Sequence, residues 1–506
     1  MAYILGIDAG TTSLKAAVFC MDGSLVASGV EDYVLLTPSP NQVELPAESY
    51  WEHLCTLIRN LMKKSGVKPE EILSLAISSQ GETLICLDEK GEALRPAIVW
   101  LDNRSGEEAA EIEKEFGLQE IYERTGQPEC VATWPATKIA WLRRHEPEIY
   151  EKTAKFLLLE DYLLYRLTGK FACEENLLAS SLLYDINGRC WWKEMLQYLG
   201  IDENRLAKVL PCGTPVGKVT EAAARETGLS VQILAATGAL DQTCGIVGVG
   251  RIKPGEVTET TGSCLAVCAN VGQFVPWSKE RRITCQNHAV PGRYVVLLWS
   301  QTAGMVLKWY VNQFYQKEKA EGADGFALAD EEAATVPAGC DGLVMLPHLS
   351  GASNPEYNSL AKGVFYGVTL KHGRPHFSRA ILESVAFMLR RNLEQVEGLG
   401  QPVDVVYSMG GGSKSPIWNS IKADVTGKPV ETLKTRESAC LGAAVLGAVA
   451  AGLYGDVDSA VEGLVRSGER FEPHPENRAV YDRNFENYLD LYDALEPLFS
   501  KYPSQA

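Results

Sequence analysis

The stretch Tyr3-Ile-Leu-Gly-Ile-Asp-Ala-Gly-Thr-Thr-Ser13, followed by an apolar run from Leu14 to Phe19, decides the fold. Two short apolar runs joined by turn-forming residues predict a β-hairpin. A second piece of this kind runs from Glu256 through Thr261-Gly-Ser263 to Ala269. Each piece is a strand, a turn of glycine with threonine or serine, and a strand. The sequence therefore indicates a duplicated domain with a hydroxyl-rich turn at corresponding places.

Apolar strands alternate with helical spacing between and after these hairpins, which predicts an α/β architecture. We expect strands at 73–77, 84–87, 294–299 and 403–409, and helices at 48–64, 136–144, 377–397, 416–425 and 439–451. A chain of 506 residues is too long for one ordinary core. We expect two domains, residues 1–247 and 248–490. The boundary is placed near the glycine-rich stretch Gly245–Gly250, where a hinge is physically easy.

Composition limits the partners. The 46% hydrophobic and 22% charged residues are typical of a soluble globular protein. A net charge of -17 argues against nucleic acid or an anionic membrane surface, because both would be repelled. The thirteen cysteines form no C-x-x-C pair, and the N-terminus has no basic leader. We therefore expect a cytoplasmic protein with free thiols.

Three short motifs are candidates for chemistry. In the first, Asp8 ends a strand and Gly10, Thr11, Thr12 and Ser13 follow it. Such a turn can hold a hydrated magnesium ion and cradle phosphate oxygens with its N–H groups. The ordinary alternative is a hairpin turn that happens to be rich in turn-forming residues, and the hexapeptide alone does not separate the two.

The second motif is Gly411-Gly-Ser413, between a predicted strand and a predicted helix, where backbone can approach an anion or nucleotide. It is neither a P-loop nor a dinucleotide fingerprint. In the third, Asp241-Gln242 ends a strand of small residues before a glycine-rich helix start, which suits a side chain that faces a cleft. A tight strand–helix turn and an N-cap aspartate are the ordinary alternatives.

Taken together, these pieces resemble the FGGY carbohydrate kinases. The family signature is met by Gly363-Val-Phe-Tyr-Gly-Val368 and, after seven residues, His376-Phe-Ser-Arg-Ala-Ile-Leu-Glu383. A second signature is nearly met by Thr133-Trp-Pro-Ala-Thr-Lys-Ile-Ala-Trp-Leu142, where Thr133 departs from the usual first residue. The resemblance extends from about residue 3 to about residue 490. It implies two actin-like (ribonuclease-H-like) domains with a catalytic cleft between them.

The resemblance also implies roles for individual residues. Asp241 is similar in position to the family's catalytic base. Asp8 and Asp241 are similar in position to the residues of its magnesium site. The residues similar to the family's sugar pocket are Gln80, Gly81, Glu82, Asp102, Trp134, Asp241 and Gln242. Those similar to its phosphate and adenosine sites are Gly10, Thr11, Thr12, Ser13, Thr261, Gly262, Ser263, Gly304, Gly411, Gly412 and Asn419. ATP and Mg²⁺ are thus the implied cofactors, and a homodimer is a family-level expectation.

The substrate is less constrained. Glycerol kinases usually carry Arg-Glu-Thr, and xylulose kinases Met-His-Gly, where this chain has Gly81-Glu-Thr83. The framework is closer to the xylulose kinases, so a pentulose such as xylulose is the leading substrate. A polyol or sugar acid, of the glycerol, erythritol or gluconate type, is the alternative. A non-catalytic regulator that binds ATP and sugar is a further one, which the retention of both Asp8 and Asp241 disfavours.

Overall fold

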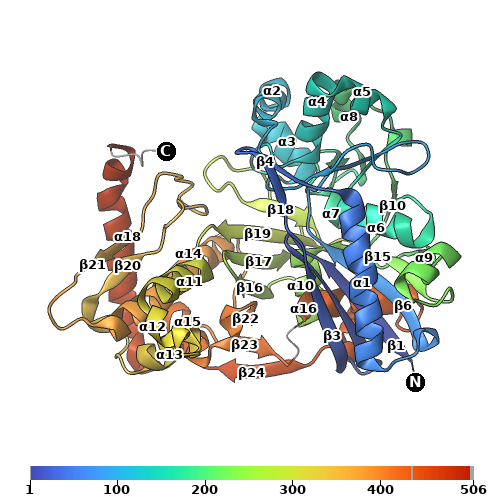
Figure 1. Ribbon diagram of the computed structural model, residues 1–506. Coiled ribbons are helices and arrows are strands. Elements are labelled where there is room, and N and C mark those ends of the chain that lie inside the picture. The colour runs from blue at the N-terminus through green and yellow to red at the C-terminus, as the bar shows by residue number, and fades with distance from the viewer. Residues whose placement is uncertain (1, 435–436, 502–506) are drawn as a thin grey trace.

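The computed structural model describes residues 2–434 and 437–501 and is built around two large mixed sheets (Figure 1). In order across the first sheet, the strands are β14 (Pro215–Lys218), β15 (Leu234–Leu240), β6 (Ile72–Ser79), β1 (Tyr3–Ala9), β2 (Ser13–Cys20) and β3 (Leu25–Asp32). Across the second they are β18 (Thr284–Asn287), β19 (Tyr294–Ser300), β17 (Leu265–Val271), β16 (Val257–Thr261), β22 (Val406–Met409), β23 (Val430–Leu433) and β24 (Ser467–Phe471).

The two sheets repeat one plan. In each, a hairpin (β1–β2 or β16–β17) is followed by strands parallel to its first member, β6 and β15 in one sheet and β22 and β23 in the other. An antiparallel edge strand, β14 or β24, closes the set. The predicted hairpins and the duplication are therefore confirmed, and the fold is a pair of actin-like, ribonuclease-H-like domains.

Helices form three layers around these sheets (Figure 1). The outer face of the first sheet carries α1 (Ala47–Ser65), α6 (Leu159–Thr168) and α9 (Glu221–Thr227). Outside the second sheet lie α11 (Gly304–Phe314), α12 (Gln316–Ala320), α13 (Gly325–Ala334), α14 (Arg374–Glu397), α15 (Pro416–Thr426) and α18 (Arg478–Lys501). Between the sheets lie α10 (Asp241–Val249) and α16 (Ser438–Ala450), with α17 (Val457–Leu464) against α16.

The middle layer explains the glycines near residue 245. These residues form helix α10. A Cβ at Gly248 would lie 1.8 Å from the Ser438 carbonyl oxygen, and a Cβ at Gly442 would lie 1.8 Å from that of Cys244. The glycines thus allow two helices to touch backbone to backbone at this point in the chain. The boundary at 247/248 falls inside α10 and stays a prediction.

The rest of the first half forms a cap above the first sheet. Its helices are α2 (Gly106–Phe116), α3 (Leu118–Thr125), α4 (Pro135–His145), α5 (Pro147–Lys152), α7 (Glu175–Leu178) and α8 (Lys193–Leu199). Its strands are β4 (Leu36–Ser39), β5 (Gln42–Leu45), β7 (Ile85–Leu87), β8 (Ala97–Ile98), β9 (Lys155–Leu157), β10 (Ala172–Glu174), β11 (Tyr184–Asp185), β12 (Cys190–Trp191) and β13 (Lys208–Leu210). A hairpin of β20 (Val344–Leu346) and β21 (Val364–Tyr366) belongs to the second half.

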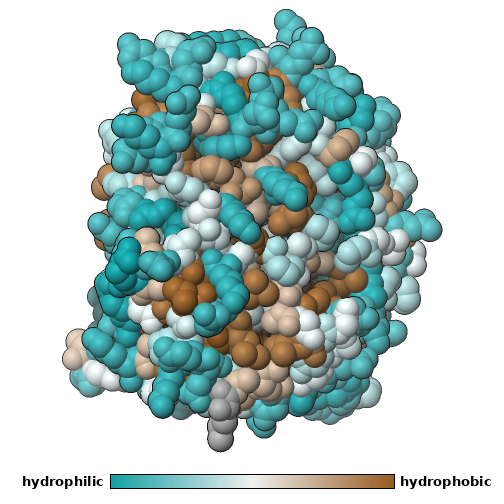
Figure 2. Space-filling model, turned by 90° about the vertical axis from the view of Figure 1, so that its right-hand side faces the viewer, coloured by the Kyte–Doolittle hydropathy of each residue, from teal (hydrophilic) through white to brown (hydrophobic). Residues whose placement is uncertain are grey.

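The outer surface is mixed in character. On the face shown in Figure 2, hydrophobic patches are interrupted by hydrophilic side chains. Within residues 2–434 and 437–501, no helix combines the length and the apolar character needed to span a membrane. All thirteen cysteines are free, and most are buried, as expected from their apolar surroundings in the sequence.

Candidate active site

A first cavity of about 580 Å³ lies where the two halves meet. The first half contributes the turn after β1, the segment after β6 and the start of α10, while the second half contributes residues 282–301 and 352–359. Its lining includes seven of the predicted site residues: Thr11, Gln80, Gly81, Glu82, Trp134, Asp241 and Gln242.

Asp241 is the first residue of α10 and directly follows the last residue of β15. The end of a parallel strand is where side chains reach the edge of a sheet and face a cleft. Burial raises the pKa of the Asp241 carboxyl to about 8, and the charges of Asp8 and Glu82 add to the rise. The Gln242 N–H, 2.7 Å from Asp241 Oδ1, partly opposes it. The carboxyl can therefore gain or lose a proton within about one pH unit of neutrality.

Glu82 is held in an unusual backbone conformation, with a φ of 60°. A non-glycine residue in this region is strained, and such strain tends to persist at functional sites. The buried Lys138 ammonium donates hydrogen bonds to the backbone oxygens of Glu82, at 2.8 Å, and Val99, at 3.1 Å. Burial raises the pKa of the Glu82 carboxyl and lowers that of Lys138. Lys138 thus braces the turn that presents Glu82 to the cavity.

Gln80 supplies polar groups without partners. Its side chain is 3% exposed, and neither amide atom makes a hydrogen bond of ordinary geometry in the described chain, although Gln80 is close enough to the Tyr50 hydroxyl to lower its pKa. A buried amide left unpaired in this way is costly unless a ligand pairs with it. Beside it, Trp100 Nε1 donates to Thr11 Oγ1 at 2.9 Å, which ties the cavity wall to the turn after β1.

Asp8 lies behind this turn, at the penultimate position of β1. Ser78 on the neighbouring strand β6 donates to Asp8 Oδ1 at 2.8 Å. Burial raises the pKa of Asp8, while Ser78 and the charge of Lys15 oppose the rise. Asp8 and Asp241 are thus two desolvated carboxyls close enough to repel, a pairing that a divalent cation would relieve.

A second cavity of about 630 Å³ lies within the second half. Its lining includes the predicted residues Thr261, Gly262, Ser263, Gly304, Gly411 and Gly412. A Cβ at Gly304 would lie 2.3 Å from the Gly262 carbonyl oxygen, and a Cβ at Gly412 would lie 2.7 Å from Thr261 Cβ. Three separate turns therefore pack together only because these positions are glycine, and they leave a hollow lined by backbone.

A fully buried ion pair supports this hollow. Lys422 on α15 lies 2.6 Å from Glu259 on β16, and both side chains are inaccessible to solvent. Glu259 also accepts hydrogen bonds from Ser408 and Thr261. The Thr261 hydroxyl is thus turned toward the protein, which leaves backbone N–H groups and Ser263 to face a ligand. The sequence patterns gave no sign of this pair.

Some predicted site residues lie outside both cavity linings. Gly10 and Ser13 close the β1–β2 turn through an N–H to O bond of 3.0 Å, and Thr12 accepts from the Tyr33 N–H at 3.0 Å. Asp102 is fully buried, and its oxygens accept from Arg104 and from the Val43 N–H. Asn419 donates to the Ser413 carbonyl, and its own oxygen has no described partner. Their predicted roles stay predictions.

Several lining residues were missed by sequence reasoning. In the first cavity they include Trp100, Gln127, Glu129, Arg282, Trp299 and Tyr357, and in the second Lys308, Phe326, Asp330 and Trp418. Trp100 stands two residues before the predicted Asp102, which was a usable signal. Trp299 ends the strand expected at 294–299, which was a second usable signal. The others in the first cavity are brought together by the packing of the two halves, and those in the second cavity by packing within the second half.

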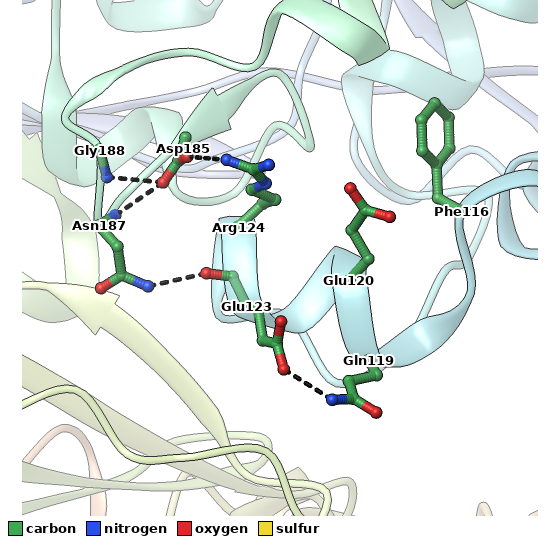
Figure 3. A pocket seen from close by; sticks show the side chains of 8 residues that line it. All are labelled: Phe116, Gln119, Glu120, Glu123, Arg124, Asp185, Asn187 and Gly188. Carbon is green, nitrogen blue, oxygen red and sulfur yellow. Dashed lines mark hydrogen bonds and ion pairs between the residues drawn. The ribbon is translucent and has the colours of Figure 1, made fainter.

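A further cavity, of about 550 Å³, lies on the cap and is shown in Figure 3. Arg124 pairs with Asp185 at 2.7 Å, while Asn187 and Gln119 donate to Glu123. These groups satisfy one another, and none of the predicted site residues lies in this lining. The cavity therefore lacks the convergent unpaired groups of the first one.

Comparisons with known proteins agree with this geometry. The family model for the N-terminal domain of the FGGY family of carbohydrate kinases matches residues 3–248, and the model for its C-terminal domain matches residues 266–451. An autoinducer-2 kinase of Klebsiella pneumoniae is 30% identical, covering 97% of this chain and 94% of its own. A xylulose kinase of Staphylococcus epidermidis is 28% identical, covering 98% and 97%.

A solved gluconate kinase from Lactobacillus acidophilus superposes with a TM-score of 0.89 at 25% identity, covering 99% of each chain. The match thus spans both sheets, the middle layer and the cap. The chain belongs to the FGGY family of carbohydrate kinases.

Proposed function

We propose that this kinase transfers the γ-phosphoryl group of ATP to a hydroxyl of a small sugar, with a pentulose such as xylulose as the first candidate. The observation that carries the proposal is the position of Asp241. It stands at the junction of β15 and α10, in the wall of a cavity built from both halves, with a pKa near neutral. Phosphoryl transfer to an alcohol needs an acceptor for the hydroxyl proton at such a place.

The other residues of the first cavity would hold the sugar. Glu82 accepts hydrogen bonds from substrate hydroxyls when it is ionised, and Gln80 both donates and accepts. Trp134 supplies an apolar ring whose own Nε1 is already bonded to the Glu129 carbonyl at 3.0 Å. Asp241 would take the proton of the bound hydroxyl as the new O–P bond forms.

The second cavity would hold the nucleotide. Its glycine turns leave backbone exposed to a ligand, and Phe326 and Trp418 offer aromatic surface beside them. Backbone N–H groups at such turns bind phosphate oxygens without a charged side chain. The nucleotide contacts would thus come from the second half alone, and the sugar contacts from both halves.

Asp8 and Asp241 would hold a magnesium ion, which neutralises the charge of the phosphates when bound. Two carboxyls do not complete a magnesium shell, which usually keeps several waters. Within the described chain, no cluster of three or more acidic, histidine or cysteine side chains could form a metal site. A hydrated ion shared with phosphate oxygens fits this donor set.

The choice of a pentulose rests on the similarity of the whole chain to xylulose kinases and on the volume of the first cavity. The xylulose kinase of S. epidermidis aligns over nearly its whole length. A cavity of about 580 Å³ is larger than a three-carbon polyol requires and falls within the range of ordinary small-molecule sites. Both points favour a five-carbon or six-carbon substrate over glycerol.

One observation favours a sugar acid as a second candidate. The Arg282 guanidinium borders the cavity and lies over the Tyr357 ring, 5.4 Å from its centroid. In the described parts of the chain it has neither an ion-pair nor a hydrogen-bond partner. Glu129 is close enough that Arg282 lowers its pKa, which burial otherwise raises. An unpaired guanidinium suits a substrate carboxylate.

The test is release of ADP from magnesium-ATP with a panel of pentuloses, polyols, hexoses and sugar acids. We expect the highest kcat/KM for a pentulose, little change in it with Arg282→Leu, and a poor rate with glycerol. A sugar acid that ranks first and loses its advantage in Arg282→Leu would establish the second candidate instead. Absence of sugar-dependent ADP release across the panel would overturn the proposal and favour a non-catalytic regulator.

A further inference from the structure

Near the end of strand β15, the backbone N–H groups of Gly238 and Leu240 are paired by side chains and not by a neighbouring strand. Strand β14 pairs with β15 only from Leu234 to Ala236, and the β15–β6 register shifts between Ala236 and Ala239. Buried backbone donors are nearly always paired, so other groups must serve Gly238 and Leu240. Side chains do so: Glu160 Oε1 accepts from the Gly238 N–H at 2.8 Å, and Asn176 Oδ1 accepts from the Leu240 N–H at 3.0 Å.

Leu240 matters because it immediately precedes Asp241. It is the N-cap residue of α10, and its own side chain makes no capping bond. Its N–H group is thus held by a hydrogen bond one residue before Asp241, whose carboxyl is proposed to accept the proton. A side chain that holds this group also holds the direction in which α10 and Asp241 begin.

Asn176 has a second bond, to the other half of the molecule. Its Nδ2 donates to the backbone oxygen of Asn287 on strand β18. Asn176 is completely buried, and Glu174 caps the short helix α7 that carries it. One amide therefore spans from the start of α10 to the second sheet.

Strand β18 is the edge of the second sheet and lies against the first half at two further points. The Cys285 N–H donates to the Gly126 carbonyl at 2.9 Å, and Gln286 Nε2 donates to Ser180 Oγ at 3.2 Å. Ser180 in turn lies beside Glu82 and lowers its pKa. The strand is thus linked to the residue before Asp241 through Asn176, and to Glu82 through Gln286 and Ser180.

We propose that Asn176 is a positioning residue for phosphoryl transfer, which fixes the start of α10, and so the Asp241 carboxyl, relative to strand β18. The inference rests on the proposed role of Asp241. An amide is suited to this place because one side chain supplies both the acceptor for Leu240 and the donor for Asn287. Asn176 itself lines neither cavity, and it acts on Asp241 through the neighbouring lining residue Leu240.

The test replaces Asn176 by Leu, which keeps its approximate size and removes both bonds. A displacement of about 1 Å at a reacting group can cost on the order of 100-fold in rate. We expect kcat for the best sugar to fall roughly 10- to 100-fold while KM for the sugar and for ATP stays within about threefold.

A double-mutant cycle separates positioning from general damage. In the Asp241→Asn background the acceptor is already lost, so Asn176→Leu should lower kcat there by less than about threefold, because residues that act as a unit are not additive. The same full loss in both backgrounds would overturn the proposal. Wild-type turnover of the best sugar is measured alongside, so a failure of the proposed function is seen separately.

The matched control is Asn270, another fully buried asparagine. Its Nδ2 donates to the backbone oxygens of Arg251, at 2.7 Å, and Glu256, at 3.0 Å, away from both cavities. Asn270→Leu should lower thermal stability as Asn176→Leu does, but leave kcat per folded molecule and the pH dependence of kcat unchanged. An equal loss of kcat in both variants would contradict a role specific to Asn176.

If Asn176→Leu does not fold, Asn176→Thr removes the amide with less crowding. Its kcat is then expressed per folded molecule, with the folded fraction taken from thermal unfolding, and its KM values need no such correction. A kcat per folded molecule that falls by more than about threefold while KM stays unchanged supports the proposal, and a smaller change in kcat overturns it.

Discussion

At the scale of the residue, the proposed chemistry depends on three buried carboxyls. Asp241, Asp8 and Glu82 all have raised pKa values because burial disfavours their charged forms. Three such groups in one region repel one another until a cation or a proton is shared. The site therefore holds free energy that binding of a magnesium nucleotide can release.

Replacing Asp241 by Asn tests the proton acceptor. The amide keeps the size of the side chain but takes no proton, so kcat should fall by ~10²–10⁴ with the melting temperature little changed. In the wild type, kcat/KM should rise with pH up to about 8, because the carboxyl of the free enzyme is protonated below its pKa. Steady-state rates from pH 6 to 9 measure both, and wild-type turnover in the variant would mean that another group accepts the proton.

Replacing Asp8 by Ala tests the metal. The variant should need more magnesium for half-maximal rate at saturating ATP, since one of two proposed ligands is gone, while nucleotide binding changes little because its contacts lie in the second half. Asp32→Ala, an exposed carboxyl at the end of β3, is the matched control. Magnesium titrations that superpose for wild type and Asp8→Ala would assign Asp8 a structural role only.

At the scale of the element, the crossing of α10 and α16 decides how close the two halves come. Gly248 and Gly442 let the helix backbones touch, and a Cβ at Gly6 on β1 would lie 1.8 Å from the Cys440 carbonyl oxygen. Small residues at a helix crossing shorten the distance between the axes. The position of Asp241, the proposed base at the start of α10, is therefore fixed by a closely packed helix crossing.

Gly442→Ala should force this joint apart. The added methyl group would overlap the Cys244 carbonyl, and overpacking of a core costs typically 1–3 kcal/mol and sometimes more. Gly447→Ala, on the same helix, would meet its nearest neighbours at 3.4 Å and should be neutral or slightly stabilising, since Ala favours a helix over Gly. The melting temperatures of the two variants are compared by thermal unfolding. Equal values would show that the helix crossing can accommodate an additional methyl group at Gly442.

The start of helix α6 should give stability a pH dependence. Burial raises the pKa of Asp161 to about 7, from an ordinary value near 4, although its Oδ2 accepts from the Leu158 N–H. Between these values the folded protein holds a proton that the unfolded chain has lost. The free energy of unfolding should thus fall as pH rises from about 4 to 7, by up to about 1.4 kcal/mol per pH unit from this group.

Asp161→Asn keeps an acceptor for Leu158 and removes the titration, so denaturant unfolding at pH 5 and pH 7.5 should show a smaller difference than in the wild type. The control is the exposed Asp202→Asn, whose carboxylate accepts from the Asn204 N–H at the start of a short 3-10 helix. A pH difference of the same size in Asp161→Asn and wild type would refute the assignment. The pKa of Glu174 is also raised, to about 8, so the free energy of unfolding of Asp161→Asn should still fall with rising pH, but less steeply than in the wild type.

At the scale of the whole molecule, the local sequence patterns predicted the main strands, helices and turns but not the contacts between the two halves. The hairpins, the helices at 377–397 and 439–451 and the glycine turns followed from periodicity and turn chemistry. The sequence did not show that Gly245–Gly250 lies in a closely packed helix, because glycine permits both flexibility and close packing and the partner helix is distant in sequence. The Lys422–Glu259 pair could not be predicted because its two members are far apart in sequence. The position of Arg282 at the first cavity could not be predicted because much of the surrounding lining comes from the other half of the chain.

The placement of α16 has a consequence for how the chain is made. One face of the first sheet, with Ile4, Phe19 and Ala236, packs on Leu441 and Val445 of that helix. A ribosome completes the strands long before it reaches residue 441, so the nascent first half carries an uncovered apolar face. We expect the fragment 1–247 expressed alone to aggregate or bind a hydrophobic dye, and co-expression of 248–506 to restore solubility and kinase activity. A soluble fragment that does not bind the dye would show that residues 1–247 bury this apolar face without helix α16.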